Sequence, residues 1–287
     1  MSLLKNNEFR PMLAHKVGNK IDFSQPVFVQ AKLDGIRCYI TKDGAFTRNG
    51  KEIKNVEHVK AKLVEFFTWH PDFILDGELY NHKLKDNFNK IVSLVKKQKP
   101  TEADRKESES LIQFHWYDVV TDEKQQERAR RIKEMYNFFF GRRLLENTIG
   151  MVRTFEVQDQ KQIDAMHKQY LLEGYEGTIV RLNGQYKVSG RSKDLLKVKD
   201  FEDTEATIID AVEGKGRLAG RLGKFVMRDA QGVVFGCPAG KFTHAQRKEM
   251  WENRKDFIGK EATFEFFQRT PDNSYRHPLF KAIRDYD

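Results

Sequence analysis

Short apolar segments of strand length recur along the first 200 residues, and this repetition restricts the chain to folds built on sheets. They are rich in β-branched and aromatic residues and cover 27–33, 37–50, 73–80, 111–120, 177–182 and 195–201. Patterns typical of amphipathic helices occupy 56–67, 123–140 and 159–174. Because strands and helices are mixed without a regular β-α-β alternation, the pattern predicts an α+β domain. Within it, Asp43 and Gly44 predict a tight hairpin turn.

The pattern of expected strands and helices changes near residues 199–203. Beyond this point, short strands punctuated by glycine are expected at 206–214, 220–229, 231–240 and 261–270, with one amphipathic helix at 243–257. Several short strands and one helix in a segment of this length are typical of a small closed barrel such as an OB fold. The sequence therefore predicts two domains, residues 1–200 and residues 201–287.

The chain is basic, and its basic character belongs mostly to the first domain. The formal net charge is +9 at neutral pH. Residues 1–200 hold 36 Lys and Arg against 28 Asp and Glu, a net +8, whereas residues 201–287 hold 15 against 14, a net +1. Six lysines and one acid lie within residues 83–99, which by itself indicates a solvated helix face. A positive surface favours polyanionic partners such as nucleic acid.

The sequence also indicates the compartment in which the protein works. No apolar run is long enough to cross a bilayer, and residues 1–10 lack the apolar core of a signal peptide. Only two cysteines occur, Cys38 and Cys237, each in an apolar stretch, so neither a disulfide framework nor a cysteine-ligated zinc site is expected. We therefore expect a cytoplasmic protein with no membrane partner and with reduced, buried thiols.

The segment around Lys32 is the first candidate for chemistry. Lys32 follows an apolar run and precedes Asp34, Gly35 and Arg37. A lysine at a strand end beside a glycine turn can approach a phosphate, and its amine becomes a nucleophile where neighbouring cations or burial favour loss of its proton. Arg37 can supply such a cation and can also hold phosphate by a forked contact. Taken alone the pattern is weak, and a polar hairpin with a surface lysine explains it more simply.

Two acidic motifs lie at the ends of other apolar segments. Asp76, Gly77 and Glu78 interrupt one of them, and Glu176 comes directly before another. Carboxylates at strand ends can hydrogen-bond a ribose hydroxyl or bind a divalent ion. Each motif can equally be an ordinary turn or the start of a strand, so neither identifies a function alone.

Basic residues form a third group of candidates. Lys197 and Lys199 would point to the same face of a strand, because side chains alternate with a period of two. Two cations on one face suit an anion such as a triphosphate, while an exposed edge strand is the alternative. Arg48 and Arg191 lie in predicted turns, where they are suited to holding terminal phosphates. Such arginines are equally common on surfaces without function.

Several common site motifs are absent from the sequence. It contains neither GxxxxGK[ST] nor GxGxxG after a strand, which excludes nucleotide binding by either of those loops. The eight histidines show no HxxxH spacing and no pairing with cysteine, so we expect no dedicated zinc site.

Six motifs follow one another in a single order along the chain. They are KLDGIR at 32–37, TRNG at 47–50, ILDGELY at 74–80, HWYDVV at 115–120, YEGTIVR at 175–181 and LLKVKDF at 195–201, followed by the barrel-like segment. This ordered set resembles the covalent nucleotidyltransferases, and specifically the minimal ATP-dependent DNA ligases of viruses and bacteriophages. The resemblance covers nearly the whole chain, and six motifs in register are highly specific.

The resemblance implies a role for each matching residue. Lys32 matches the nucleophile that attacks the α-phosphate of ATP and then carries AMP. Glu78 matches the residue that holds the ribose, and Tyr117 matches the aromatic ring that stacks on adenine. Lys197 and Lys199 match catalytic lysines that contact phosphate oxygens. Gln30 and Arg37 complete the implied set of nucleotide-binding residues: Gln30, Lys32, Arg37, Glu78, Tyr117, Lys197 and Lys199.

Metal and DNA contacts are implied in the same way. Glu176, together with Glu78, matches carboxylates near the catalytic Mg²⁺, for which Mn²⁺ can substitute. Arg48 and Arg191 match arginines that hold the 5′-phosphate of a nick. In the barrel, the stretch 213–225 is short, so Lys215, Arg217 and Arg221 are expected to grip phosphates from one side. Four residues near the C-terminus fit the family's last motif: Arg276, Pro278, Phe280 and Arg284.

The reaction that the resemblance implies has three steps. AMP moves from ATP to Lys32 and then to the 5′-phosphate of nicked duplex DNA, and finally the 3′-hydroxyl displaces AMP and seals the strand. This activity serves DNA replication, repair and recombination. The implied protein is a monomer without an obligate protein partner, located in the cytoplasm, or in the host cytoplasm if a virus or phage encodes it.

Three alternatives remain open from the sequence. An mRNA-capping RNA guanylyltransferase shares the KxDGxR motif and the barrel, and an RNA ligase uses the same lysine. The non-enzymatic alternative is a basic DNA-binding module of the OB type. An NAD-dependent ligase is disfavoured, because the chain lacks both room for an extra N-terminal domain and the cysteines of a zinc module.

Overall fold

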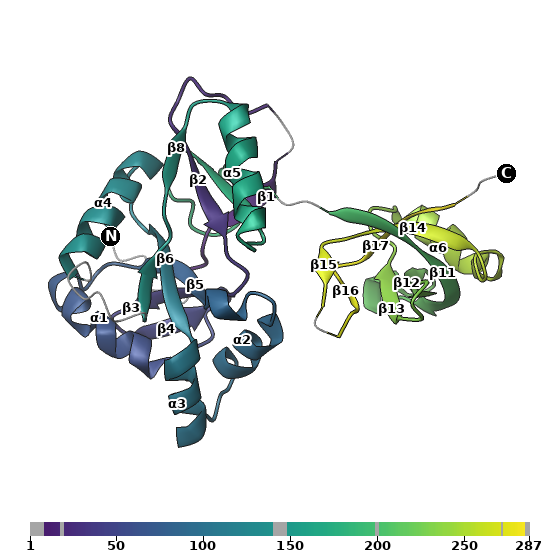
Figure 1. Cartoon of the computed structure of the whole chain (residues 1–287), viewed down its shortest axis with the longest axis horizontal. Helices are drawn as coiled ribbons and strands as arrows, with labels where there is room; N and C mark the ends of the chain where they lie inside the picture. The colour runs from purple at the N-terminus through teal and green to yellow at the C-terminus, as the bar shows by residue number, and fades with distance from the viewer. Residues whose placement is uncertain (1–8, 18–19, 140–147, 199–200, 271, 285–287) are drawn as a thin grey trace. The chain divides into compact units, whose positions relative to one another are not determined.

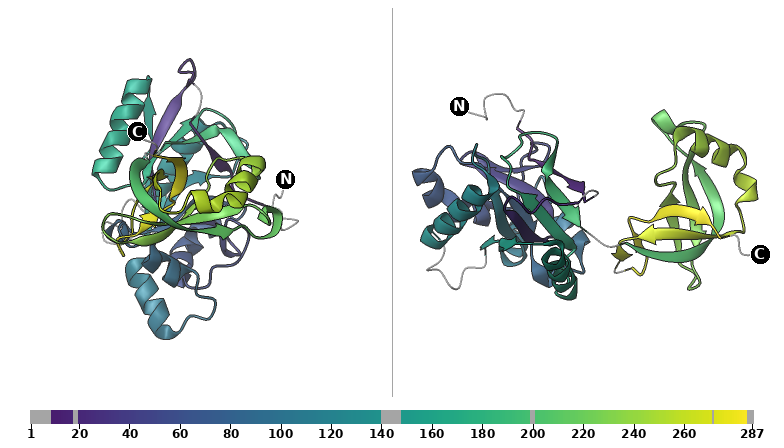
Figure 2. Two further views of the ribbon diagram at one scale, coloured as in Figure 1. Left: turned by 90° about the vertical axis from the view of Figure 1, so that its right-hand side faces the viewer. Right: turned by 90° about the horizontal axis from the view of Figure 1, so that it is seen from above.

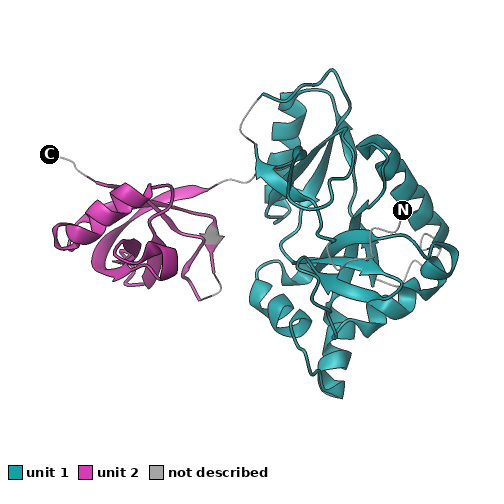
Figure 3. Ribbon diagram, turned by 180° about the vertical axis from the view of Figure 1, so that it is seen from behind, with its two compact units in different colours: residues 1–199 teal, residues 200–287 magenta. Residues whose placement is uncertain are grey.

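The structure is a computed structural model that describes residues 9–17, 20–139, 148–198, 201–270 and 272–284. The chain divides into two compact units, Met1–Lys199 and Asp200–Asp287 (Figure 3). The first is mixed α and β, and the second is mainly β (Figure 1).

The first unit is built on two five-stranded sheets. In the first sheet the strands lie in the order β1 (Leu13–Lys16), β10 (Arg191–Val198), β9 (Gly177–Leu182), β2 (Val27–Lys32) and β8 (Phe155–Val157). In the second sheet the order is β4 (Gly44–Thr47), β3 (Ile36–Thr41), β5 (Leu75–Tyr80), β6 (Gln113–Val119) and β7 (Ile149–Met151). Most neighbours are antiparallel, but β1 with β10 and β6 with β7 are parallel.

Helices cover the outer faces of these sheets. They are α1 (Glu57–Trp69), α2 (Phe88–Val95), α3 (Glu102–Leu111), α4 (Gln125–Phe139) and α5 (Gln160–Leu172), with a short 3₁₀ turn at His82–Leu84. Leu63 and Phe66 of α1 and Ile132 of α4 are buried in one apolar core with the second sheet. Ile163 of α5 packs with Val29 and other residues of the first sheet. Burial of these apolar faces, more than helix propensity, stabilises the helices.

Three of these helices confirm the helical patterns read from the sequence, to within a few residues at each end. Helices α2 and α3 were not predicted as separate elements. Helix α3 is polar and buries only Ser108, so it lacks an apolar stripe to detect. Its signal in the sequence is a capping box, in which the Thr101 hydroxyl and the Asp104 carboxylate accept from each other's backbone N–H.

The lysine-rich run forms α2 and the segments beside it. Ile91, Leu94 and Val95 are buried, whereas the lysines lie at the surface, so the run is solvated as expected. Only Lys90 lies within α2, however, so the run is not a single helix face. Lys90 pairs with Glu107 of α3 at 2.5 Å, and Lys97 pairs with Asp104. Part of the positive charge of the run is therefore neutralised within the unit.

The turn after Lys32 is not a hairpin. Strands β2 and β3 are consecutive in the chain but belong to different sheets, so the KLDG segment crosses from one sheet to the other. A Cβ at Gly35 would lie 2.3 Å from the carbonyl oxygen of Leu79, so only glycine permits this close approach. By contrast, the predicted hairpin between β3 and β4 is present, with Thr41 opposite Gly44. The crossing brings Lys32 to the space between the sheets.

The second unit is a curled sheet of five strands. The order is β13 (Val234–Pro238), β12 (Leu222–Arg228), β11 (Glu202–Glu213), β14 (Glu261–Phe266) and β17 (Leu279–Ile283). The end strands β13 and β17 also contact each other, so the sheet curls into a barrel, with α6 (His244–Glu252) beside it (Figure 2). A small hairpin, β15 (Gln268–Arg269) with β16 (Tyr275–Arg276), and two 3₁₀ turns at Gly216–Leu218 and Arg254–Asp256 complete the unit. The predicted OB-like architecture is confirmed.

Both cysteines are buried and unpaired, as expected. Burial raises the pKa of the Cys237 thiol to about 12 and that of the Cys38 thiol further, which keeps both protonated. Within the described part of the chain, no helix is both long enough and apolar enough to cross a membrane.

Candidate active site

A cavity of about 300 Å³ lies in the first unit, and residues of both sheets line it. The residues predicted from the sequence that line it are Gln30, Lys32, Arg37, Arg48, Glu78, Tyr117, Arg191 and Lys197. Ile179 and Leu195 add apolar surface. A concave site with an apolar wall and a few convergent polar groups is the usual form of a small-molecule site.

Lys32 lies at the end of β2, where its main chain pairs with Gly177 of β9. Its ammonium contacts the carboxylate of Glu176, and the two residues also share a backbone hydrogen bond of 3.1 Å from the Glu176 N–H. Glu176 is buried, and Lys32 is only one-fifth exposed in its side chain, at 20%. Two residues that are 144 positions apart in the sequence thus meet at one edge of the cavity.

Glu78 faces the cavity from β5 of the second sheet. The Tyr117 hydroxyl donates a hydrogen bond of 3.3 Å to its carboxyl group. Burial raises the pKa of Glu78 to about 8, although the positive charges of Lys32 and Arg37 act in the opposite direction. At neutral pH the carboxyl group therefore keeps its proton and can donate a hydrogen bond to a ligand.

Arg37 is held by Asp76 and does not lie free beside Lys32. Its Nε and Nη2 atoms donate to the two Asp76 oxygens at 3.0 and 2.6 Å. Burial disfavours the charge, but Asp76 outweighs this effect and raises the pKa of Arg37 well above its usual range. The Tyr186 hydroxyl donates to the same carboxylate at 2.7 Å. Asp76 thus has a structural role, because its carboxylate fixes Arg37 and Tyr186. The sequence motif had suggested a contact with a ribose hydroxyl or a metal instead.

A buried charged network lies behind the cavity, and the sequence reading missed it. Asp118 accepts hydrogen bonds from Arg128 Nε at 2.8 Å and from Arg181 Nη1 at 2.5 Å. These side chains are 0%, 1% and 3% exposed. Burial alone would raise the pKa of Asp118, but the two arginines lower it overall. The available signal was a charge inside two otherwise apolar segments, HWYDVV and GTIVRL.

Gln30 connects this network to the cavity wall. Its Oε1 accepts from Arg181 at 2.7 Å, and its Nε2 donates to the Tyr117 carbonyl at 3.1 Å and to the Thr154 hydroxyl at 2.8 Å. The expected contact of Gln30 with a nucleotide remains a prediction, because most of its amide is already used by the protein.

The remaining basic candidates lie at the rim of the cavity or outside the described residues. Arg48 is in an exposed turn, whereas Arg191 is the first residue of β10, not in the turn expected from the sequence, and donates to the Ala14 carbonyl at 2.6 Å. Lys197 projects from the same strand toward the cavity. Lys199, expected on the same face, lies outside the described residues.

In the second unit, the basic residues between β11 and β12 differ from one another. Lys215 and Arg217 are exposed at the 3₁₀ turn. Arg221 instead folds back, and its Nη1 donates to the carbonyls of Arg217 and Ala219 at 3.1 and 3.2 Å. Its guanidinium thus stabilises its own loop in this structure, and the expected contact of Arg221 with phosphates remains a prediction.

Residues of the C-terminal motif also support the barrel. Phe280 is buried in the core and packs on Phe225, with ring centres 5.0 Å apart. Arg284 pairs with Glu205 of β11. The guanidinium carbon of Arg276 lies 5.9 Å from the ring centre of Phe267. In this structure these residues contact the barrel itself.

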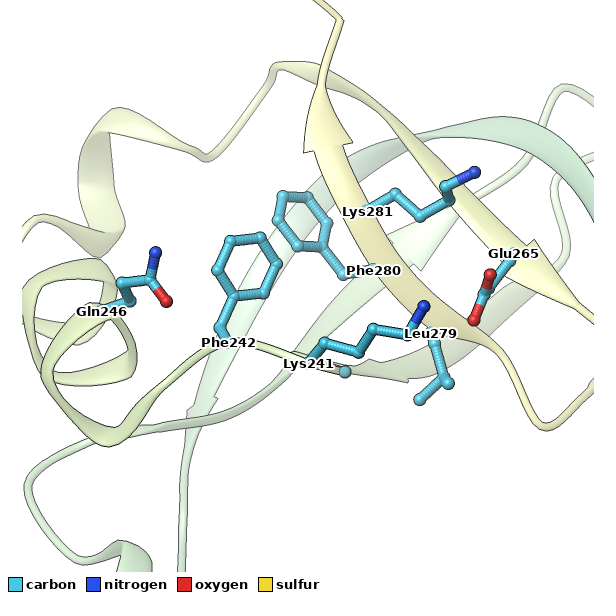
Figure 4. Close-up of a pocket in the computed structure, with 8 residues that line it drawn as sticks. Lys241, Phe242, Gln246, Glu265, Leu279, Phe280 and Lys281 are labelled. Carbon is cyan, nitrogen blue, oxygen red and sulfur yellow. The ribbon is translucent and has the colours of Figure 1, made fainter. Parts of the chain in front are cut away.

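The second unit has a cavity of its own, of about 330 Å³ (Figure 4). Phe242 and Phe280 lie side by side there, with ring centres 5.6 Å apart, and Lys241 and Lys281 stand near Leu279 and Glu265. Lys281 is already paired with Asp203 at 2.6 Å. Apart from Phe280, no residue singled out from the sequence lines this cavity, so the cavity at Lys32 is the better candidate active site.

The carboxylates near Lys32 fit a metal ion that enters the site bound to a nucleotide. Within the described ranges, no group of three or more His, Cys, Asp or Glu is arranged to hold a metal. Glu176 and Glu78, however, both act on the Lys32 charge from nearby positions. Mg²⁺ commonly binds one or two carboxylates and completes its shell with phosphate oxygens and water. Two carboxylates therefore suffice for a site that is completed by a nucleotide.

Comparisons with known proteins agree with this arrangement. The family described as "ATP dependent DNA ligase domain" matches residues 11–199, and that described as "DNA ligase OB-like domain" matches residues 213–284. A DNA ligase of African swine fever virus is 25% identical over 260 residues, covering 85% of this chain and 59% of the viral protein. A DNA ligase of Haemophilus influenzae is 25% identical over 228 residues, covering 77% of this chain and 75% of that protein.

Solved structures show the same fold. A Lig E DNA ligase superimposes with a TM-score of 0.79 at 24% identity, covering 96% of this chain and 99% of that one. The Chlorella virus DNA ligase-adenylate gives 0.52 at 26% identity, covering 98% and 99%. The chain spans about 59% of the length of the first viral relatives. Since the ligase-domain match alone includes more than half of the residues, the chain belongs to the ATP-dependent DNA ligase family.

Proposed function

We propose that this chain seals nicks in duplex DNA with ATP, through an AMP group carried on Lys32. The observation that carries the proposal is the convergence of Lys32, Glu78, Tyr117 and Lys197 on one cavity, with Glu176 in contact with the lysine. A lysine at the edge of a nucleotide-sized cavity, surrounded by hydrogen-bonding groups and a second cation, is suited to nucleotidyl transfer.

In the first step, the Lys32 amine attacks the α-phosphorus of ATP. A phosphorus–nitrogen bond forms, the bond to the leaving oxygen breaks, and pyrophosphate departs. The amine must lose a proton to attack, and the Glu176 carboxylate is the acceptor in contact with it. Lys197 faces the same cavity and would stabilise the charge that develops on the phosphate oxygens.

The nucleoside would lie along the wall formed by β5 and β6. The Tyr117 ring offers a face for the base, and the Glu78 carboxyl group can hydrogen-bond a ribose hydroxyl in either protonation state. When bound, Mg²⁺, for which Mn²⁺ can substitute, would neutralise charge on the departing pyrophosphate. Glu176 and Glu78 would be its protein ligands, and the charge of the metal would favour loss of the Glu78 proton.

The later steps would use the rim of the cavity and the second unit. AMP passes from Lys32 to the 5′-phosphate of the nick, and attack by the 3′-hydroxyl then releases AMP. Arg48 and Arg191, which line the cavity, would hold that phosphate, and the exposed Lys215 and Arg217 would contact the duplex backbone without regard to sequence. We assign nucleotidyl transfer to residues 1–200 and duplex binding to the basic surface of this unit together with residues 201–287.

We also propose that the chain works as a monomer in the cytoplasm, without an obligate protein partner. Two buried, unpaired thiols are compatible with a reducing compartment.

The decisive experiment measures the covalent adduct and the sealed strand separately. Protein incubated with α-labelled ATP and Mg²⁺ should retain label on a denaturing gel, and nicked duplex DNA should be joined. Lys32→Ala should abolish both while duplex binding is largely retained. Lys42→Ala, a matched change at an exposed lysine in the next hairpin, should leave both intact.

The same assay separates the alternatives. A GMP adduct without an AMP adduct would instead identify a capping guanylyltransferase, and faster joining of nicked RNA than of nicked DNA would identify an RNA ligase. If Lys32→Ala left every activity unchanged, the chain would be a binding module and the proposal would be wrong.

A further inference from the structure

Gln30 and Arg181 form a fixed hydrogen-bonding unit in the wall of the active-site cavity. Both side chains line the cavity, and they are only 2% and 3% exposed. They come from the neighbouring antiparallel strands β2 and β9, in which Gln30 is opposite Ile179 and Arg181 is opposite Phe28. Since side chains alternate along strands, this register puts both on the same face of the first sheet.

Arg181 decides which way the Gln30 amide points. A guanidinium can only donate hydrogen bonds, so the atom that meets Arg181 Nε at 2.7 Å must be the amide oxygen. The amide nitrogen then faces the Tyr117 carbonyl at 3.1 Å and the Thr154 hydroxyl at 2.8 Å. Both amide hydrogens are used, and the capacity that remains is one lone pair of the oxygen.

Arg181 is itself held from a second direction. Its Nη1 atom donates to Asp118 at 2.5 Å, and its guanidinium carbon lies 5.6 Å from the centre of the Tyr117 ring. Rotation of the Gln30 amide would therefore place its NH₂ group against a cation that cannot move away without breaking a buried ion pair. The amide is therefore locked with its oxygen on the Arg181 side, within the wall of the cavity, where it can only accept.

An acceptor at this position distinguishes between purine bases. Adenine carries an amino group that can donate to it, whereas guanine carries a carbonyl oxygen at the corresponding ring position. A guanine carbonyl facing the Gln30 oxygen finds no donor there, so a buried acceptor is left unpaired and two oxygens are held close together, which is unfavourable. A glutamine free to rotate would accept either base equally.

We propose that Arg181 is a specificity-determining positioning residue, which makes the site select adenine over guanine nucleotides by fixing the orientation of the Gln30 amide. The inference rests on the proposed function, because it presumes that a nucleotide base lies against Gln30. Arg181 acts through Gln30 and makes no contact with the reacting phosphate.

The test is the ratio of kcat/KM for adduct formation with ATP and with GTP, measured on the full chain. Arg181→Lys keeps a cation that can reach Asp118, but its single nitrogen cannot occupy both the Nη1 position at Asp118 and the Nε position at Gln30. We expect the ratio to fall at least about ten-fold, the size of one unmade hydrogen bond. The fall should come from a raised KM for ATP and a lowered KM for GTP, with little change in kcat for ATP.

Arg128→Lys is the matched control, because Arg128 binds the same Asp118 carboxylate but does not contact Gln30. It should lower the melting temperature by a comparable amount while leaving the ATP to GTP ratio unchanged. If Arg181→Lys does not fold, Thr154→Val provides the second test. It frees one amide hydrogen of Gln30 at a partly exposed site, and it should lower the ratio in the same direction by a smaller factor.

The outcomes separate this inference from the proposed function. An unchanged ratio in both Arg181→Lys and Thr154→Val, or an equal fall in Arg128→Lys, would overturn the inference. Equal use of ATP and GTP by the unaltered chain would do the same while leaving nucleotidyl transfer to Lys32 intact. Failure to form any adduct would refute the proposed function itself.

Discussion

Replacing Asp118 with alanine should weaken the first unit more than any ordinary surface change. Asp118 is fully buried and is the shared counter-ion of Arg128 and Arg181, which join α4 and β9 to the second sheet. Alanine would leave two guanidinium groups buried without their carboxylate. Removing one partner of a buried ion pair costs about 3–5 kcal/mol.

The contacts that Arg128 and Arg181 would keep decide where in this range the loss of unfolding free energy falls. Arg128 would keep the carbonyls of Glu123 and Gly184, at 2.7 and 3.1 Å, and Arg181 would keep Gln30. These neutral partners offset part of the loss, so we expect the free energy of unfolding to fall by about 3–4 kcal/mol. At about 2–4 °C per kcal/mol for a unit of this size, the melting temperature should fall by about 6–16 °C.

Urea unfolding followed by tryptophan fluorescence measures this change. Trp116 is a suitable reporter, because it is buried and its indole N–H donates to the Asp118 carbonyl at 2.7 Å. Asp122→Ala, four residues along at an exposed position, is the control and should change the free energy by less than about 0.5 kcal/mol. The reasoning would be refuted if the free energy of unfolding of Asp118→Ala fell by less than about 1 kcal/mol while the slope of this free energy against urea concentration stayed unchanged.

Three further predictions use the pKa shifts. The pKa of Asp118 in the folded chain lies below its unfolded value of about 3.9. The ionised Asp118 therefore stabilises the fold fully above that pH, and this stabilisation is lost as the pH falls through the lower folded pKa. In acid titrations, the stability advantage of wild type over Asp118→Asn should shrink below about pH 4. The pKa shift of Glu78 has the opposite sign, from about 4.3 in the unfolded chain to about 8 in the folded one. Thermal melts should therefore show wild type losing stability relative to Glu78→Gln as the pH rises between these two values. A difference in melting temperature that stays constant over this range would contradict the raised pKa. Finally, Cys38 and Cys237 should react with a thiol reagent at neutral pH only after unfolding, and rapid reaction of either in the folded chain would show that its burial is not maintained.

Local patterns in the sequence were sufficient to identify the strands around the site and the architecture of both units. Alternation and apolar runs mark β2, β5, β6, β9 and β10, because each strand must bury one or both faces whatever its neighbours are. The barrel is recognisable for the same reason, since short strands punctuated by glycine have few other ways to pack. The order of six motifs then identified the family, as the domain matches confirm.

Elements without a strong local pattern were missed. Strands β7 and β8 have three residues each, too few for alternation to be visible, and they exist because β6 and β2 offer them hydrogen-bonding edges. Helix α3 has almost no apolar face. These elements depend on a surface that forms only when the rest of the unit has folded.

The partners of each charged side chain were decided by the tertiary structure. From the sequence, Arg37 was the cation expected beside Lys32, but sheet register places it opposite Glu78 and within reach of Asp76, so the nearest charge to Lys32 is the carboxylate of Glu176. Local sequence dictates which residue types are available and on which face of a strand each lies. Which of them meet depends on the register between strands that are far apart in the chain. Because the interior has a low dielectric, each such pairing then determines the protonation and orientation of the side chains in it.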